Sequence, residues 1–484
     1  MSTRSLAPAL LVRLSIAALF AATIGLSLAP VRAAETAAAP RPNIVFVLAD
    51  DLGSHDVGWR GSDIKTPNLD RLANSGAKLD QFYVQPVCSP TRAAFMTGRY
   101  PFRYGFQTGV VRPWAKYGLP LEERMLPQAL SEAGYETAIV GKWHLGHFQP
   151  EYLPTKRGFQ HQYGHYNGAL DYFTHIRDGG FDWHKDDLVN RDEGYSTELV
   201  GKEASRLIAA RDKSKPFFLY VPFNGVHSPY QVPDKYSDAY PQFSGQRKKY
   251  AGMVTALDEA VGKIVETLKS EGMVENTLVL FSSDNGGPAP GRITSNGPLR
   301  AGKATVYEGG VRVCAFAAWP GKIPAGSTVT TPIHISDWYP TLIGLAGGKT
   351  EQALPVDGRD VWASVTTGAP SPRQEFVLNA APQGGAIRIG DWKLVLNGAA
   401  ADDEEGAEAQ PMPKRKKKAQ GDEDAVELFN LASDAGEKSD LSASEPARVK
   451  ELKERYQALA AQAVVPKSGP KPKGFEPPAV WGEP

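Results

Sequence analysis

The sequence predicts an α/β protein: a large, mostly parallel sheet covered by helices, followed by a smaller C-terminal α+β subdomain with an antiparallel sheet and a helix. Short apolar runs alternate with stretches of helical period, which is typical of a parallel sheet with helices on both faces. After Asp357 the character changes, and apolar and polar residues alternate around a Gly-Asp turn at 390–391, which indicates a β-hairpin. We therefore expect a main domain at 42–355 and a C-terminal subdomain at 356–484.

Composition and the N-terminal segment suggest an exported globular protein. The 484 residues are 42% hydrophobic and carry no formal net charge, so nothing favours nucleic acid or an anionic membrane surface as a partner. Residues 1–33 are similar to a secretory signal, with Arg4 ahead of an apolar run at 14–28 and a small residue for cleavage near Ala33. That run is short for the alternative, a membrane anchor, so we expect a periplasmic or secreted protein without stable membrane insertion. A linker at 34–41 follows.

Four apolar runs predict buried strands, and each ends in a polar loop. The runs are 43–48, 136–140, 217–221 and 277–281, and their loops carry Asp50 and Asp51, Lys142 and His144, His227, and Asp284 and Asn285. Because such loops gather at the carboxyl edge of an open α/β sheet, we expect these side chains to converge on one ligand site.

Adjacent carboxylates at Asp50 and Asp51 are costly at a strand end unless a cation or partner neutralises them. Turn or helix capping is the alternative, although one Asp would satisfy it. Carboxylate and amide oxygens suit one Ca²⁺ ion, or Mg²⁺, and the lack of Cys or His pairs at ligand spacing argues against zinc.

Further elements follow from local patterns. We expect helices at 66–73 with Thr66 as cap, at 126–132, at 248–270 and at 446–463, strands at 311–316 and 426–431, and a strand followed by a helix within 333–342. Residues 159–187 are rich in aromatics and histidines without a clean period, which predicts a long loop suited equally to stacking on sugars and to core packing. The charged insert at 399–425 reads as a solvated loop, and the Pro-rich tail from Val465 as a wrap or a disordered end.

The stretch 87–99 places a cysteine at a predicted helix start. Ser89 can cap this helix, Pro90 suits its first turn, and Gly98 can end it. The side chain of Cys88 would then lie beside unpaired backbone N–H groups, where an anion binds well. A disulfide between Cys88 and Cys314, the only other cysteine, is the plain alternative; otherwise Cys314 is a buried, inert thiol.

The pattern Cys88-x-Pro90-x-Arg92, followed by Thr97-Gly98-Arg99, resembles the signature of type I sulfatases of the alkaline phosphatase superfamily. The resemblance runs from Pro42 to about Gly348, and 427–437 resembles the family's C-terminal strand and turn. It implies that a maturation enzyme oxidises Cys88 to formylglycine (3-oxoalanine). The implied calcium ligands are Asp50, Asp51, Cys88, Asp284 and Asn285. The implied catalytic residues are Cys88, Arg92, Lys142, His144, His227 and Lys303.

The resemblance also implies a mechanism. One hydroxyl of hydrated formylglycine attacks sulfur while Ca²⁺, Lys142, Lys303 and Arg92 stabilise charge on the sulfuryl oxygens. His227, with Lys303, protonates the departing alcohol, and His144 takes a proton from the second hydroxyl, which expels sulfate.

The expected activity is a sulfuric ester hydrolase of arylsulfatase type. Residues 167–175 resemble the arylsulfatase B-like, N-acetylgalactosamine-4-sulfatase branch, which favours a sulfated carbohydrate over an aryl sulfate. Arg103, Arg112 and Lys116 are candidates to hold a neighbouring acidic group, with ordinary surface charge as the equal alternative. A phosphomonoester or phosphonate ester hydrolase is the second hypothesis. A non-catalytic protein that binds sulfated glycans is disfavoured, because no matched catalytic position is lost.

Overall fold

The computed structural model describes residues 41–381, 384–398 and 425–483. The expected signal peptide, residues 34–40 of the linker and residues 399–424 of the insert lie outside the described residues. Arg41–Pro484 form one compact unit, within which the domain boundary expected near residue 355 stays a prediction. Of the helices described, none is both long and apolar enough to span a bilayer.

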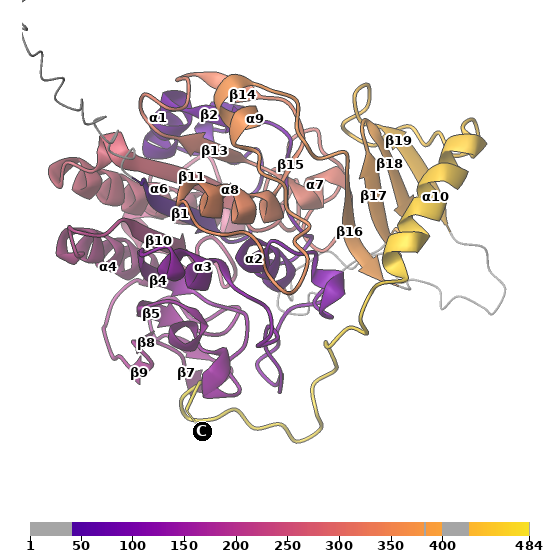
Figure 1. Ribbon diagram of the computed structural model, residues 1–484. Helices are drawn as coiled ribbons and strands as arrows, with labels where there is room; N and C mark the ends of the chain where they lie inside the picture. Colours follow the sequence, from indigo (N-terminus) through magenta and orange to yellow (C-terminus); the bar gives the residue numbers. More distant parts are fainter. Residues whose placement is uncertain (1–40, 382–383, 399–424, 484) are drawn as a thin grey trace, which may run out of the picture. The chain divides into compact units, whose positions relative to one another are not determined.

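A ten-stranded sheet in the order β14-β2-β13-β11-β1-β10-β4-β5-β8-β9 runs through the main part of the fold (Figure 1). Its five central strands are parallel: β11 (Thr277–Ser283), β1 (Asn43–Ala49), β10 (Phe217–Pro222), β4 (Glu136–Lys142) and β5 (His161–His165). Shorter strands flank them: β2 (Ala77–Leu79), β8 (His184–Lys185), β9 (Leu188–Val189), β13 (Ala315–Ala318) and β14 (Ser327–Val329). The mostly parallel sheet and all four predicted strands are confirmed.

Helices cover both faces of this sheet. Alternate side chains of β1 point to opposite faces and enter two separate hydrophobic clusters, each of which includes residues of helices. One cluster includes residues of α2 (Cys88–Thr97), α3 (Leu126–Glu132), α8 (Trp338–Leu345) and α9 (Trp362–Thr367). The other includes residues of α1 (Pro67–Ser75), α4 (Ser196–Ala210), α5 (Asp234–Ser237) and α6 (Gly245–Ser270).

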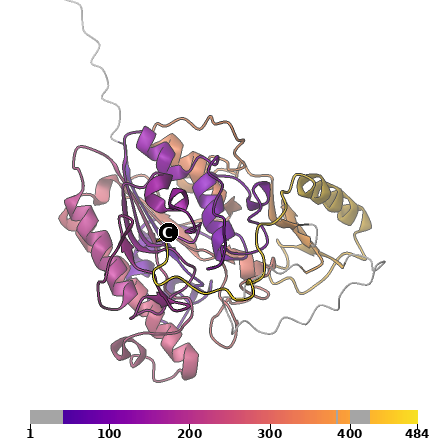
Figure 2. The same cartoon turned by 90° about the horizontal axis from the view of Figure 1, so that it is seen from below.

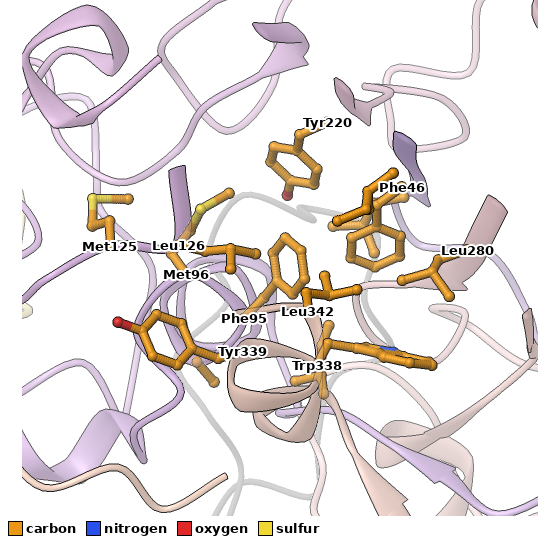
Figure 3. Close-up of a cluster of buried hydrophobic side chains, with 14 of the residues drawn as sticks. Phe46, Phe95, Met96, Met125, Leu126, Tyr220, Leu280, Trp338, Tyr339 and Leu342 are labelled. Carbon is orange, nitrogen blue, oxygen red and sulfur yellow. The ribbon is translucent and has the colours of Figure 1, made fainter. Parts of the chain in front are cut away.

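The first cluster fixes α2, which carries the cysteine. Figure 3 shows Phe95 of α2 between Phe46 of β1 and Tyr220 of β10, with ring centroids 4.5 Å and 5.5 Å apart, respectively. Every residue of α2 is buried. A helix held on all sides in this way presents its first turn in one orientation, which a catalytic group requires.

One strand prediction and one loop prediction were wrong. The strand expected at 311–316 is divided: α7 (Glu308–Val311) runs into β12 (Arg312–Val313), and the chain passes Cys314 before β13 begins in another sheet. β12 pairs instead in a three-stranded sheet with β3 (Phe82–Tyr83) and β15 (Ile333–His334). The expected long loop at 159–187 contains β5, β8 and a two-stranded sheet of β6 (Ile176–Arg177) and β7 (Gly180–Phe181). β6, β7 and β8 have two residues each and leave no period to detect.

The C-terminal part forms an antiparallel sheet of β16 (Glu375–Ala381), β17 (Gly384–Ile389), β18 (Trp392–Leu396) and β19 (Val426–Asn430), with α10 (Pro446–Ala460) packed on it (Figure 1). The hairpin expected around Gly390 and Asp391 is confirmed, as are the strand at 426–431 and the final helix. This sheet and α10 are the α+β element that the sequence predicts.

A buried charge cluster joins this sheet to α7. Lys393 of β18 lies 2.9 Å from carboxylate oxygens of both Glu308 and Glu437, and all three side chains have no exposed surface. Glu437 also accepts a hydrogen bond from the backbone N–H of Glu308 at 2.6 Å. Burial and the nearby Glu308 raise the pKa of Glu437 to about 7. One lysine therefore holds two carboxylates that would otherwise repel each other out of water.

Replacing Lys393 by methionine is expected to lower the free energy of unfolding by about 3–5 kcal/mol, because two buried carboxylates lose their counter-charge. The loss should be larger at pH 8 than at pH 6, since protonation of Glu437 relieves the repulsion. Urea denaturation at both pH values measures it. Lys450→Met is the control: its ion pair with Glu454 is exposed, and its removal should cost less than about 0.5 kcal/mol. Equal stability of the two variants would contradict the role of the cluster.

Candidate active site

Four adjacent strands, β11, β1, β10 and β4, deliver the predicted polar loops to one edge of the sheet. Asp50 and Asp51 follow β1, Lys142 ends β4, and Asp284 follows β11, while His227 lies five residues beyond β10. All five side chains are buried. Asp51 and His144 adopt left-handed backbone conformations, with φ of 62° and 60°, which are uncommon for residues other than glycine and concentrate at functional sites.

The helix that carries Cys88 begins two residues earlier than the capping pattern predicts, because Ser89 as the cap would make Pro90 the first helical residue. α2 starts at Cys88 itself, after Val87 in an extended conformation, and Gly98 ends it with a φ of 67°. Ser89 does not cap the helix: its hydroxyl donates to the His144 carbonyl at 2.8 Å and accepts from the Val111 N–H at 3.0 Å. The serine therefore connects two loops around the cysteine.

The Cys88 thiol faces oxygen atoms from two strand ends. Sγ lies 3.4 Å from Asp50 Oδ1 and 3.5 Å from Asn285 Oδ1. Burial, and then the charges of Asp284 and Asp50, raise the pKa of this thiol well above its ordinary value. An unmodified Cys88 would therefore stay protonated at neutral pH, which makes it a poor nucleophile. The disulfide alternative is excluded, because Cys88 and Cys314 are both free and buried.

The carboxylates fit a hard cation. One ligand atom each from Asp50, Asp51, Cys88 and His227 lie within 4.8 Å of one another. The Asn285 amide N–H donates to Asp51 Oδ1 at 2.7 Å, and the amide oxygen of the same side chain lies 3.5 Å from Cys88 Sγ. Asn285 therefore belongs to this group. Burial and Asp284 raise the pKa of Asp50 to about 6, which marks a crowded anionic site that a cation would relieve. Oxygen donors dominate this set, as Ca²⁺ or Mg²⁺ requires.

Three cations surround these acids. Lys142 Nζ lies 2.6 Å from Asp50 Oδ2, and Lys303 Nζ lies 2.9 Å from Asp51 Oδ2. Burial opposes ionisation of Asp51, but Lys303 and His227 more than offset it and lower its pKa to about 2. Asp50 likewise raises the pKa of Lys142 against the effect of burial. Asp50 therefore favours the charged form of Lys142 within this buried site.

Arg92 is the third cation, and it contacts protein groups on every side. Its Nε and Nη2 donate to Asp284 Oδ2 at 3.1 Å and 2.8 Å, and its Nη1 donates to the Lys142 carbonyl at 2.9 Å. The side chain has no exposed surface. These contacts orient Asp284 and the end of β4 relative to α2.

The two histidines have different hydrogen-bond partners. His144 Nε2 faces the Val111 carbonyl at 3.1 Å, and burial followed by Lys142 lowers the His144 pKa well below its ordinary value. His227 Nδ1 faces the Ser228 carbonyl at 2.6 Å, while its Nε2 lies 3.2 Å from Lys303 Nζ and 3.6 Å from Asp51 Oδ2. A carbonyl oxygen only accepts hydrogen bonds, so the ring nitrogen that faces it carries a proton. In the neutral form of each imidazole, that atom is Nε2 for His144 and Nδ1 for His227.

Direct side-chain contacts connect the following predicted residues: Asp50, Asp51, Cys88, Arg92, Lys142, His227, Asp284, Asn285 and Lys303. The His144 carbonyl accepts a hydrogen bond from Ser89, the residue after Cys88. Sequence reasoning missed the connecting role of Ser89 and the carbonyls of Val111 and Ser228. Backbone carbonyls leave no residue-type signal, and Ser89 read locally as a helix cap.

Comparisons with known proteins agree on one family. The family model Sulfatase matches residues 42–348. Mouse arylsulfatase J is 38% identical over 491 residues, covering 93% of this chain and 81% of that protein. Mouse N-acetylgalactosamine-6-sulfatase is 37% identical over 388 residues, covering 74% of this chain and 73% of that protein. A crystal structure of Ps i-CgsB in complex with k-i-k-neocarrahexaose matches with a TM-score of 0.78 and 33% identity, covering 88% of this chain and 94% of that one.

Proposed function

The chain belongs to the sulfatase family and is a sulfuric ester hydrolase; from that premise we propose that it is an exported, calcium-dependent enzyme that releases sulfate from a sulfated carbohydrate. The position of Cys88 carries this proposal: it stands at the first turn of a buried helix, against Asp50 and Asn285 and beside Lys142 and Lys303. The similarity to Ps i-CgsB, whose structure contains a carrageenan-type hexasaccharide, supports a sugar substrate over an aryl sulfate.

Asp50, Asp51, Asp284, Asn285 and the modified side chain at 88 would hold the metal. When present, formylglycine supplies a hydrated aldehyde as nucleophile, and the metal supplies positive charge beside it. Lys142 and Lys303 add fixed positive charge where the sulfate group would lie, which stabilises charge developing on its oxygens. The contacts of Arg92 favour a positioning role, through Asp284 and the Lys142 carbonyl, rather than the direct contact with sulfate that the resemblance implies.

The proton transfers divide between the two histidines. Lys303 donates toward His227 Nε2, so this pair shares a proton that can pass to the departing alcohol oxygen. His144 is neutral because burial and Lys142 lower its pKa, and its basic atom is Nδ1, so it can accept a proton when sulfate leaves.

Matched substrates test the function. The metal-loaded protein should release sulfate from 4-nitrophenyl sulfate and from a panel of sulfated glycosaminoglycan and carrageenan oligosaccharides, measured by ion chromatography. It should hydrolyse 4-nitrophenyl sulfate faster than 4-nitrophenyl phosphate. Faster turnover of the phosphate would favour the phosphomonoester hydrolase hypothesis instead, and release from the aryl ester alone would remove the carbohydrate assignment.

His227→Gln is expected to lower kcat about 10²–10⁴-fold on a sugar sulfate, because the departing alkoxide loses its proton donor. The effect should be much smaller on 4-nitrophenyl sulfate, whose phenolate leaves without protonation. Steady-state kinetics on both substrates measure the difference. His161→Gln, a partly exposed histidine paired with Glu136, is the control and should leave both rates unchanged. An equal loss on both substrates would contradict the proton-donor role.

Cleavage of the expected signal peptide can be tested separately. Protein recovered from the periplasm or medium should begin near Ala34, because the small residues at 31–33 suit cleavage after Ala33. Edman sequencing or peptide mass mapping reads this end directly. An intact N-terminus on membrane-associated protein would favour the anchor alternative.

A further inference from the structure

The C-terminal tail, residues 464–481, is anchored along the main domain at both ends. The Val464 N–H donates to the Phe102 carbonyl at 2.8 Å. Toward its other end, the Phe181 N–H donates to the Ala479 carbonyl and the Trp481 N–H donates back to Phe181, both at 2.9 Å. Figure 2 shows the tail in yellow, running from α10 across this face. The alternative of a wrapping tail, which the sequence left open, is therefore the one observed.

The tail lies against residues 110–117, and this segment borders the active site. Val110 packs in one cluster with Cys88, and the Val111 carbonyl faces His144. Trp114 follows four residues after Val110, so even a fully extended chain keeps it within about 14 Å of that residue. The region where tail and segment meet is therefore within reach of a short oligosaccharide whose reacting sulfate lies at residue 88.

A cavity of about 210 Å³ opens between the tail and this segment. Arg112 and Lys116 line it from the segment and Lys467 lines it from the tail, with Trp114 as an aromatic wall. The Trp114 indole is fixed in place, because its Nε1 donates to the Gly469 carbonyl at 3.1 Å. The described residues that line the cavity include no acid. Two exposed cations, Lys116 and Lys467, thus meet at one place in a chain without net charge, which favours an anionic ligand.

The size of the cavity limits its ligand. It is smaller than the pockets of about 300–1,000 Å³ that enclose drug-sized molecules, so it suits one sugar residue or its charged substituent. Arg103, which the sequence suggested alongside Arg112 and Lys116, is not available for this purpose. Its guanidinium donates to both carboxylate oxygens of Asp357, at 2.7 Å and 2.6 Å. The tail supplies Lys467 in its place.

We propose that this cavity is a second binding site for the carbohydrate, which holds a sulfate ester or a carboxylate on a sugar near the one that reacts. The inference rests on the proposed function. The backbone N–H of Lys467 donates to the Gly105 carbonyl at 2.9 Å, which fixes this stretch of the tail, while its exposed side chain reaches the cavity. The tail thereby makes the enzyme selective for substrates with more than one negative charge.

Lys467→Ala in the full-length, metal-loaded enzyme tests this site. The kcat/KM for a multiply sulfated oligosaccharide, divided by that for 4-nitrophenyl sulfate, should fall about tenfold through a higher KM, because a charge-assisted hydrogen bond is lost. Lys473→Ala removes the same charge from an exposed position of the same tail that does not line the cavity, and should leave the ratio unchanged. Added salt should lower the ratio more in the wild type than in Lys467→Ala. A ratio equal to that of the wild type in Lys467→Ala would overturn the proposal.

Two substrates identify the anion. A carrageenan hexasaccharide carries only sulfate, whereas a chondroitin sulfate tetrasaccharide also carries carboxylates. A loss on both indicates a sulfate ester, and a loss on chondroitin sulfate alone indicates a carboxylate.

Calorimetric binding of the same oligosaccharides to Cys88→Ala separates this site from the function. Weaker binding in Cys88→Ala/Lys467→Ala, together with no hydrolysis of any sugar by the wild type, would retain the binding site and reject the substrate class. Hydrolysis of the oligosaccharides at the same rate with and without the Lys467 side chain would retain the proposed function and reject the second binding site.

Discussion

Replacing Cys88 by alanine is expected to abolish sulfate release, with kcat/KM falling by at least about 10⁴-fold, because the variant has no side chain that can become the nucleophile. The fold should survive. Cys88 is one small side chain in a helix that is buried along its whole length, so loss of its sulfur should cost no more than about 1 kcal/mol. Sulfate release by ion chromatography and thermal unfolding measure the two effects.

The second cysteine provides the matched control. Cys314 lies in the core between β12 and β13, and burial raises the pKa of its thiol to about 12, so it is chemically inert. Cys314→Ala should retain activity. A tryptic peptide that contains Cys88 should have the mass of the aldehyde in active protein. Active protein with an unmodified Cys88, or activity in Cys88→Ala, would contradict the proposed nucleophile.

Removal of the metal is the second large effect expected. A chelator should abolish activity and lower the unfolding temperature, because Asp50, Asp51 and Asp284 are buried together and lose the cation that relieves their repulsion. A ligand present at 100 times its Kd contributes about 2.7 kcal/mol to stability. Returning Ca²⁺ should restore both properties, and a parallel titration with Mg²⁺ identifies the preferred ion.

Two aspartate variants show whether the response to metal belongs to this site. Asp51→Asn should lose the stabilisation by Ca²⁺. Asp258→Asn should keep it, since Asp258 is buried on α6 and accepts from the Leu69 N–H at 2.8 Å, apart from the cluster. Full activity after exhaustive chelation would reject the metal site.

Much of the fold could be predicted because its signals are local and periodic. The runs that became β1, β10 and β11 are almost entirely apolar, and β4 has an apolar centre at 138–140, as is typical of parallel strands buried on both faces. Their polar ends converge because parallel strands share a carboxyl edge, so Asp50, Lys142, His227 and Asp284 could be grouped before any coordinates. The hairpin around 390–391 was predictable for the same reason, since its turn residues and alternation are local.

Other features depend on partners far along the chain. Ser89 reads locally as a helix cap, but its hydroxyl is committed to His144 and Val111, so the helix begins at Cys88 instead. The run at 311–316 has the composition of one strand, yet its two halves pair in different sheets. In both cases tertiary hydrogen bonds outweighed a weak local preference.

The sequence by itself therefore determined the chemistry: which strand ends carry carboxylates, lysines and histidines, and which cysteine they surround. The tertiary structure alone decided how these groups are used. It turned Arg92 onto Asp284, paired Lys303 with His227, and brought Lys467 of the tail to Arg112 across more than 300 residues of chain. The physical reason is that strand and helix patterns are encoded in neighbouring residues, whereas hydrogen bonds and ion pairs between distant segments exist only after the chain has packed.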